Sequence, residues 1–369
     1  MALLVDGHCH LTLAGDLDRP ALELACSEAD LPPPTGVSYL DGHLGVALRR
    51  WCPQALGLPA HARIDDYLAR RAELGWRVAS RALLRSADLS ALLVDTGLQH
   101  DGLTSLAELG MLADAAVHEV VRLEQVAEGV AAEGVEASGF ADAYTEALGA
   151  RIRDGAVAVK SIIAYRWGLN IPPERPSPAD VTRAAGAWLR DGGGRLTDSV
   201  LLRHALWAGV DCGLPVQLHT GFGDRDLALA DADPARAQPF LAAVARAGVP
   251  VILLHCYPFH RNAGWLAQVY PHVYLDIGLS VGHLGARADA FLAECLELAP
   301  FGKVLFSTDA YLLPELYLLG AAQFRHSLAG LLDGWIAEDA MSTDDAEHLV
   351  GLIAGDNARR VYQLPDPAP

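Results

Sequence analysis

The sequence predicts an α/β protein with the (β/α)8 architecture of a TIM barrel. Eight short apolar segments alternate with Ala/Leu-rich segments along the 369 residues. Most of the apolar segments are continuous runs of Val, Ile and Leu, which is typical of parallel strands covered on both faces. Because strand and helix alternate eight times, we expect one closed barrel and a single domain over residues 1–369.

The eight apolar segments give the predicted strands. In chain order they are 3–10, 91–97, 119–126, 156–165, 214–219, 249–255, 273–279 and 304–309. Helical segments separate them, among them 104–117, 137–154, 197–212, 235–247 and 286–298. Many of these begin at Thr, Ser, Asp or Pro and several end at Gly, as the caps of helices require.

Two connections are longer than a normal strand-to-helix unit. Residues 11–90 follow the first strand and include a basic helical stretch, so they predict a helical insertion. Residues 166–196 follow the fourth strand, are rich in Pro and Gly, and predict a lid-like insertion. Both follow the carboxyl end of a strand, the side on which barrels build active sites.

Composition excludes several classes of partner. The formal charge is −18, with 46 acidic and 28 basic residues and no Lys/Arg cluster, so nucleic acid is not an expected partner. The apolar runs are too short for a membrane span or a signal peptide. The six cysteines form no CxxC pair, which is typical of reduced thiols in the cytoplasm. We therefore expect a cytoplasmic enzyme for a small molecule, with homo-oligomerisation left open.

Ligand-type side chains lie at the ends of four predicted strands: His8 and His10 on the first, His219, His255 and Asp309 on the fifth, sixth and eighth. Residues i and i+2 of a strand face the same way, so the first two imidazoles project together. A single histidine is best explained as a core residue satisfied by the backbone, but the joint pattern favours a metal site. Such nitrogen and oxygen ligands suit Zn²⁺, with Mn²⁺, Fe²⁺ or Co²⁺ as alternatives.

Several stretches carry a family resemblance. They are VDGHCH on the first strand, LHTGFGDRDL (218–227), VYPHVYLDIGL (269–279), FSTDAYLLPELYLLGA (306–321) and GDNARRVY (355–362). They resemble the amidohydrolase superfamily of metal-dependent TIM-barrel hydrolases, and within its amidohydrolase-2 branch the nodulin/FluG-type domain that occurs fused to glutamine-synthetase-like domains. The resemblance implies that His8, His10, His219 and Asp309 hold the metal.

The expected activity is hydrolysis of the C–N bond of a small amide that bears a carboxylate; a γ-glutamyl amide is suggested by the resemblance alone. A metal activates water and polarises the carbonyl, and Asp309 would accept the water's proton and pass it to the leaving group. His255 could be a further ligand, or could orient the water or stabilise the oxyanion. The alternatives are decarboxylation or isomerisation at the same metal site, or a catalytically idle regulatory protein on this fold.

Four further residues are candidates for substrate binding: Glu124, Lys160, Arg166 and Tyr257. Glu124 falls on the predicted third strand and Lys160 on the fourth, and Lys160 and Arg166 share parity. Lys160 could be carboxylated and bridge two metals, or bind a substrate carboxylate together with Arg166, or form a structural ion pair with Glu124. Without carboxylation we expect one metal ion. Tyr257, just past the sixth strand, is expected to line the pocket.

A competing motif is present at 278–282, where GLSVG matches the GxSxG nucleophile elbow of serine hydrolases. A triad of Ser280, Asp309 and either His326 or His348 could be drawn. This hypothesis is disfavoured because it leaves the strand-end histidines unexplained and lacks an upstream oxyanion motif.

Overall fold

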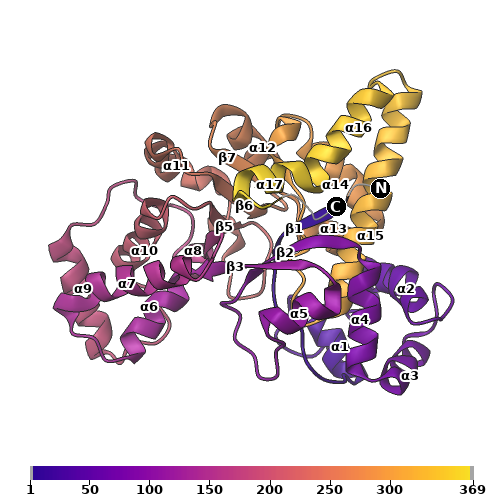
Figure 1. Cartoon of the computed structure of the whole chain (residues 1–369), viewed down its shortest axis with the longest axis horizontal. Helices are drawn as coiled ribbons and strands as arrows, with labels where there is room; N and C mark the ends of the chain where they lie inside the picture. The colour runs from indigo at the N-terminus through magenta and orange to yellow at the C-terminus, as the bar shows by residue number, and fades with distance from the viewer. Residues whose placement is uncertain (1–2, 366–369) are drawn as a thin grey trace.

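The computed structural model describes residues 3–365 and confirms the TIM barrel (Figure 1). Eight parallel strands pair in chain order. They are β1 Leu4–Cys9, β2 Leu89–Asp95, β3 Ala116–Arg122, β4 Ala158–Ser161, β5 Val216–Thr220, β6 Val251–His255, β7 Val273–Asp276 and β8 Val304–Leu305. After β8 the chain returns to β1, since Gly7 N donates to Phe306 O at 3.0 Å and Asp309 N donates to His8 O at 2.9 Å.

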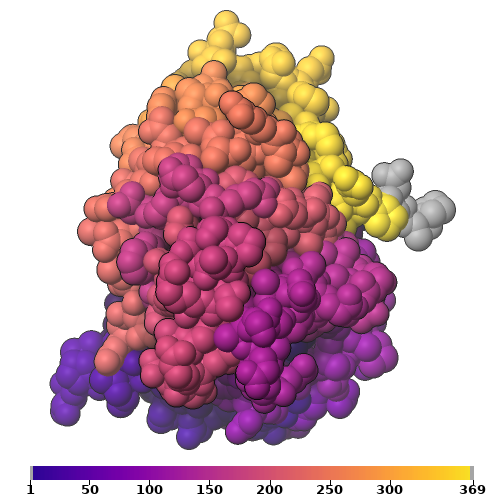
Figure 2. Space-filling view, turned by 90° about the vertical axis from the view of Figure 1, so that its left-hand side faces the viewer, coloured from indigo at the N-terminus to yellow at the C-terminus, as the bar shows by residue number. Residues whose placement is uncertain are grey.

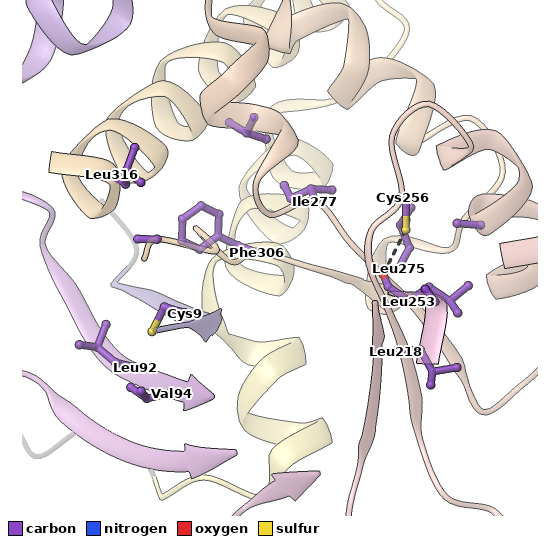
Figure 3. Packing of buried hydrophobic residues seen from close by; sticks show 14 of the residues in the cluster. Cys9, Leu92, Val94, Leu218, Leu253, Cys256, Leu275, Ile277, Phe306 and Leu316 are labelled. Carbon is purple, nitrogen blue, oxygen red and sulfur yellow. Dashed lines mark hydrogen bonds between the residues drawn. The ribbon is translucent and has the colours of Figure 1, made fainter. Parts of the chain in front are cut away.

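Alternate strand residues face two cores. Val5, Leu93 and Leu254 belong to the smaller hydrophobic cluster, which lies inside the barrel. Other members of this cluster, such as Tyr362, come from α17 (Asn357–Tyr362). Cys9 belongs with its neighbours to the larger cluster between the strands and the helices, part of which is drawn in Figure 3. This period of two is what sends the side chains of β1 alternately to the barrel interior and to the helices.

The predicted third strand, 119–126, begins and ends too late. β3 ends at Arg122, and α6 (Leu123–Ala132) begins directly after it. The prediction that Glu124 lies on a strand is therefore wrong, because Glu124 lies in the first turn of α6. Its Oε1 accepts hydrogen bonds from the Ser161 hydroxyl at 2.6 Å and from Ile162 N at 3.0 Å. A carboxylate is favoured in the first turn of a helix, a preference that an apolar run alone does not reveal.

The predicted fourth strand over 156–165 is too long. β4 ends at Ser161 and is followed by the short helix α8 (Ile163–Arg166). Arg166 is therefore helical, and the expectation that it shares strand parity with Lys160 is wrong. The strand ends at Ser161, where the Ser161 hydroxyl and the Ile162 backbone N–H both donate to Glu124.

The long connection after β1 holds four helices. They are α1 Arg19–Ala25, α2 His43–Ala55, α3 Ile64–Leu74 and α4 Trp76–Ser86. Figure 1 shows them as the indigo group of helices beside α15 (Pro314–Ala337), which α2 and α4 contact. The helical insertion thus packs against the helix that follows the last strand and its metal-ligand candidate.

The connection after β4 contains α9 (Pro178–Arg190), which packs on α7 (Phe140–Arg153) and α10 (Ser199–Asp211). Figure 2 shows this magenta-to-pink part of the chain in the middle of the face turned to the viewer. The other helices are α5 Leu106–Ala113, α11 Gln238–Val244, α12 His260–Val269, α13 Ser280–Leu284, α14 Ala288–Cys295 and α16 Thr343–Gly351. In residues 3–365, none of the helices combines the length and apolar character needed to span a bilayer.

A buried ion pair joins the insertion to the barrel. Arg71 on α3 donates from Nε to Glu315 Oε1 at 2.9 Å, and the Tyr67 hydroxyl donates to the same oxygen at 2.8 Å. Arg71 is 1% exposed and Glu315 0%. Replacing Arg71 by Met is expected to lower the free energy of unfolding by about 3 kcal/mol, because Glu315 is left buried without its cation. Urea unfolding measures this loss.

The matched variant for this prediction is Arg71→Met combined with Glu315→Gln. It removes both charges, so it should recover part of the loss. A loss below about 1 kcal/mol in the single variant, the size of an exposed pair, would show that the contact does not anchor the insertion.

Candidate metal centre

Five ligand-type side chains meet at the carboxyl end of the barrel. His8 lies in β1 and His10 follows it, His219 lies in β5, His255 ends β6, and Asp309 follows β8. Asp309 Oδ1 is 3.1 Å from His8 Nε2 and 3.4 Å from His10 Nε2, and its Oδ2 is 3.5 Å from His255 Nε2. The rings of His219 and His255 have centroids 4.6 Å apart. All five side chains are buried.

Hydrogen bonds on the far side of two imidazoles determine their tautomers. Gln217 Nε2 donates to Gly7 O at 2.7 Å, so its Oε1 must be the atom that faces His8 Nδ1 at 2.8 Å. His10 Nδ1 faces the backbone oxygen of Asp95 at 3.1 Å. Both partners are acceptors, so each Nδ1 carries the hydrogen. Each Nε2 therefore presents a lone pair to the cluster, the arrangement that metal-binding histidines adopt.

The imidazole atoms that face Asp309 Oδ1 are acceptors, because His8 Nε2 and His10 Nε2 each present a lone pair to it. Among the described residues, Asp309 Oδ1, His219 Nε2 and His255 Nδ1 are buried without a hydrogen-bond partner. Buried acceptors that face one another are unfavourable unless a cation lies between them. The ligand atoms of His8, His255 and Asp309 lie within 4.8 Å of one another. The donor set therefore fits a divalent cation.

His8, His219 and His255 are neutral near pH 7, because burial lowers the pKa of each. Burial lowers the pKa of His8 to about 4 and that of His255 to about 3. Burial alone would raise the pKa of Asp309, but the neighbouring histidines hold it well below its usual range. Neutral imidazoles and an ionised carboxylate are the protonation states in which these groups bind metals.

Lys160 lies beside this cluster. Its Nζ is 3.0 Å from His8 Nε2 and 3.9 Å from Asp95 Oδ2, and burial lowers its pKa to about 8. No ion pair between Lys160 and Glu124 is present in the described part of the chain, and Glu124 instead bonds to the residues that follow β4. The structural pair proposed from the sequence is therefore not formed.

Asp95 is the main site residue that we did not single out in the sequence. It ends β2, and the ligand atoms of His8, His10 and Asp95 lie within 4.8 Å of one another. Arg122 donates to Asp95 Oδ2 from Nε at 3.1 Å and from Nη2 at 2.6 Å. Burial alone would raise the pKa of Asp95, but Arg122 and the other charged neighbours together outweigh burial and lower it. The available signal was a carboxylate ending an apolar strand, the same signal that pointed to Asp309.

A cavity of about 450 Å³ opens above the cluster. It is lined by His10, His219, His255 and Asp309 together with side chains of both charge signs from the insertions and the strand ends. Its size is within the range of small-molecule sites.

Two of the four predicted substrate-binding residues line this cavity and two do not. Lys160 and Arg166 line it, with Arg166 Nη1 held by Glu128 Oε1 at 3.0 Å. Glu124 is buried behind it and is not among the lining residues. Tyr257 is also not among them, is 37% exposed and stacks on a histidine of α12. Tyr165 and Tyr311 supply the aromatic lining instead.

Asp6 accepts two hydrogen bonds from Thr308, the residue before Asp309. Asp6 Oδ1 accepts from Thr308 N at 2.9 Å, and its Oδ2 accepts from the Thr308 hydroxyl at 2.5 Å. Asp309 itself has a positive φ of 50°, which is uncommon for a residue other than glycine. Asp6 thus supports the backbone conformation that aims the central carboxylate.

Asp6 makes stability depend on pH. Burial raises its pKa from 3.8 to about 8, so between these values the folded chain keeps a proton that the unfolded chain has lost. The stability that Asp6 contributes is therefore fully present below about pH 4 and is lost as the pH rises to about 8. The free energy of unfolding falls over this range by up to about 1.4 kcal/mol per pH unit. Urea unfolding between pH 5 and 8 should show wild type losing stability relative to Asp6→Asn. Parallel curves would contradict this account.

Gly223 makes room for two cavity residues. A Cβ there would lie 2.0 Å from Tyr165 Oη and 3.0 Å from His219 Nε2. Gly223→Ala is expected to displace both side chains and to lower kcat/KM by about tenfold or more, since small misplacements at a reacting centre are costly. Gly129→Ala, whose Cβ would meet nothing within 4 Å, is the matched control. Steady-state kinetics equal for the two variants would contradict the prediction.

Ser280 does not serve as a nucleophile. It is 1% exposed, and its hydroxyl donates to His255 O at 3.0 Å. His255 has a positive φ of 67°, so the hydroxyl supports the unusual backbone of a site residue. The GxSxG match is thus explained by the positioning of His255.

Comparison with known proteins gives three kinds of match. The family described as Amidohydrolase matches residues 5–364. Protein fluG of Emericella nidulans is 32% identical over 246 residues, which are 62% of this chain and 28% of that protein. The solved structure of a protein classed as a metal-dependent hydrolase, from Lactobacillus casei, has a TM-score of 0.88 at 27% identity and covers 98% of this chain and 96% of that one. Glucuronate isomerase from Caulobacter crescentus shares the fold, with a TM-score of 0.64 at 17% identity over 100% of this chain and 93% of that one.

Proposed function

We propose that this chain, which belongs to the amidohydrolase family, is a metal-dependent hydrolase that cleaves the C–N bond of a small amide bearing a carboxylate. The observation that carries the proposal is the convergence of lone pairs from His8 and His10 on Asp309 at the floor of a cavity that Lys160 and Arg166 also line. Acceptors arranged in this way suit a cation, and the two basic side chains suit a substrate anion.

His8, His10, His219 and Asp309 would hold the cation. Zinc matches this mixture of imidazole and carboxylate ligands best, and one ion is expected. When bound, such a cation supplies Lewis-acid activation of water and of a carbonyl group.

Asp309 and His255 supply the proton chemistry. Asp309 remains ionised and can take the proton of the attacking water, then return it to the departing amine. His255 stays neutral at pH 7, so it donates a hydrogen bond to the developing oxyanion or orients the water without acting as an acid.

Lys160 and Arg166 would bind the carboxylate of the substrate. Both line the cavity, and the Nε of Arg166 is buried without a partner among the described residues. A guanidinium is well suited to a carboxylate. A γ-glutamyl amide is the specific substrate we propose, as the resemblance to nodulin/FluG-type domains suggests.

The test is a panel of amides given to protein loaded separately with Zn²⁺, Mn²⁺, Fe²⁺ or Co²⁺. The panel contains γ-glutamyl amides, other N-acyl amino acids and neutral amides. Release of amine from carboxylate-bearing members is the expected result. Release of CO₂ or isomerisation without amine release, or no turnover with any metal, would overturn the proposal.

A further inference from the structure

Charged side chains of both signs line the cavity, some paired with one another and some not. At its outer edge two ion pairs join different segments: Arg195 with Asp226 at 3.0 Å, and Arg225 with Asp30 at 3.2 Å. All four side chains are about half exposed. These pairs neutralise one another, so they are not available to a small ligand without being broken.

Two further carboxylates line the same cavity without such compensation. Glu28 is partly buried and comes from the insertion after β1, whereas Asp224 is exposed and comes from the loop after β5. Within residues 3–365 neither forms an ion pair, and Glu28 Oε1 is a buried atom with no hydrogen-bond partner. Tyr311 lies beside Glu28, but its hydroxyl donates to Ser27 O at 2.9 Å. Asp224 Oδ1 accepts only from the backbone, at Asp226 N.

The surroundings of Glu28 are negative. Burial raises its pKa to about 8, and the next contributions come from the charges of Asp309 and Asp224. A buried carboxylate next to two others is costly unless a cation reaches it. In the empty cavity Glu28 therefore keeps its proton near pH 7, and a ligand that brings a positive charge favours the ionised carboxylate.

The cation that fits must arrive on a substrate that is also an anion. Arg166, whose side chain is 9% exposed, lines the same cavity and keeps its Nε buried without a partner in the described chain. The cavity therefore offers an unsatisfied donor to a carboxylate and unsatisfied acceptors to an ammonium. A dicarboxylate or a neutral amide satisfies only the first of these.

We infer that Glu28 and Asp224 form a subsite for the ammonium group of a zwitterionic substrate, so that the enzyme recognises an α-amino-acid head group and not merely a carboxylate. An ammonium has three donors and can bridge two carboxylates. The inference rests on the proposed function only in using the same cavity, and it specifies the substrate class of that function.

Binding of two probes to the metal-loaded protein tests the subsite. L-glutamate and glutarate have the same chain length and two carboxylates, and differ by the ammonium. By titration calorimetry, wild type is expected to bind L-glutamate at least about tenfold more tightly than glutarate. In Glu28→Gln this ratio should fall to about two or less, while glutarate binds about as well as in wild type because it has no ammonium for the subsite.

Retained glutarate binding also shows that the variant is folded. The matched control is Asp226→Asn, two residues from Asp224 but paired at the outer edge, which should keep the wild-type ratio. Equal binding of the two probes to wild type, binding of neither, or an unchanged ratio in Glu28→Gln overturns the subsite. Turnover is not measured, so failure of the amide panel alone would reject the proposed function and leave this result standing.

Discussion

Replacement of Asp309 by Asn is expected to lower kcat/KM about 1,000-fold or more, while the protein remains folded. The carboxylate is the group on which His8, His10 and His255 converge, and it is the proposed proton acceptor. An amide of the same size keeps the packing but cannot take a proton, and loss of a general base alone costs about 10²–10⁴-fold. Steady-state kinetics on the amide identified by the panel measure the effect.

The control is Asp333→Asn, which changes an exposed carboxylate on α15. It should leave kcat/KM within about twofold of wild type, as expected for a surface change. If Asp309→Asn retained more than about a tenth of the activity, Asp309 would not be the general base, because that loss is below the range for such a group. Thermal unfolding of both variants separates a catalytic loss from a folding defect.

Replacement of His8 by Ala should abolish stoichiometric metal binding. The imidazole is 0% exposed, its tautomer is determined by Gln217, and its Nε2 faces Asp309. Wild type is expected to carry about one ion per chain after purification and dialysis, and the variant less than about a tenth of that, because a mononuclear site does not readily survive the loss of a ligand. Elemental analysis by mass spectrometry gives both values.

His326→Ala is the matched control, since His326 is exposed on α15 and contacts Arg50. It should retain the wild-type metal content. Treatment of wild type with a chelator should also lower its thermal unfolding temperature, and adding the metal back should restore it, because the ion binds only the folded chain. A His8→Ala protein with undiminished metal would remove the basis of the proposed site.

Most of the architecture followed from the sequence because parallel strands covered on both faces leave a simple signal. Continuous apolar runs such as those of β5 and β6 were located within a few residues. The errors that misplaced site candidates lie where a strand passes directly into a helix, as at Glu124 and Arg166. There the residues remain apolar or helix-compatible on both sides, and the boundary is decided by hydrogen bonds to a neighbouring strand.

The candidate site was predicted in part. The strand-end histidines and Asp309 do converge on one cavity, as expected from the common edge of parallel strands. Asp95 was missed although it ends a strand, and Tyr257 was expected to line a cavity that its side chain does not reach. Proximity to a strand end indicates the correct side of the barrel, but it does not give the direction in which a loop side chain points.

The sequence by itself determined the barrel, its order of strands and the ligand-type residues at the edge of the sheet, because these depend on local periodicity and on topology. Only the tertiary structure decided the tautomers of His8 and His10, the partner of Lys160 and the unpartnered carboxyl oxygen of Glu28. Each of these depends on atoms that lie far apart in the chain and come within hydrogen-bonding distance only when the barrel closes. The physical reason is that hydrogen bonds and buried charges act over a few ångströms in space, whereas a sequence pattern records only neighbours along the chain.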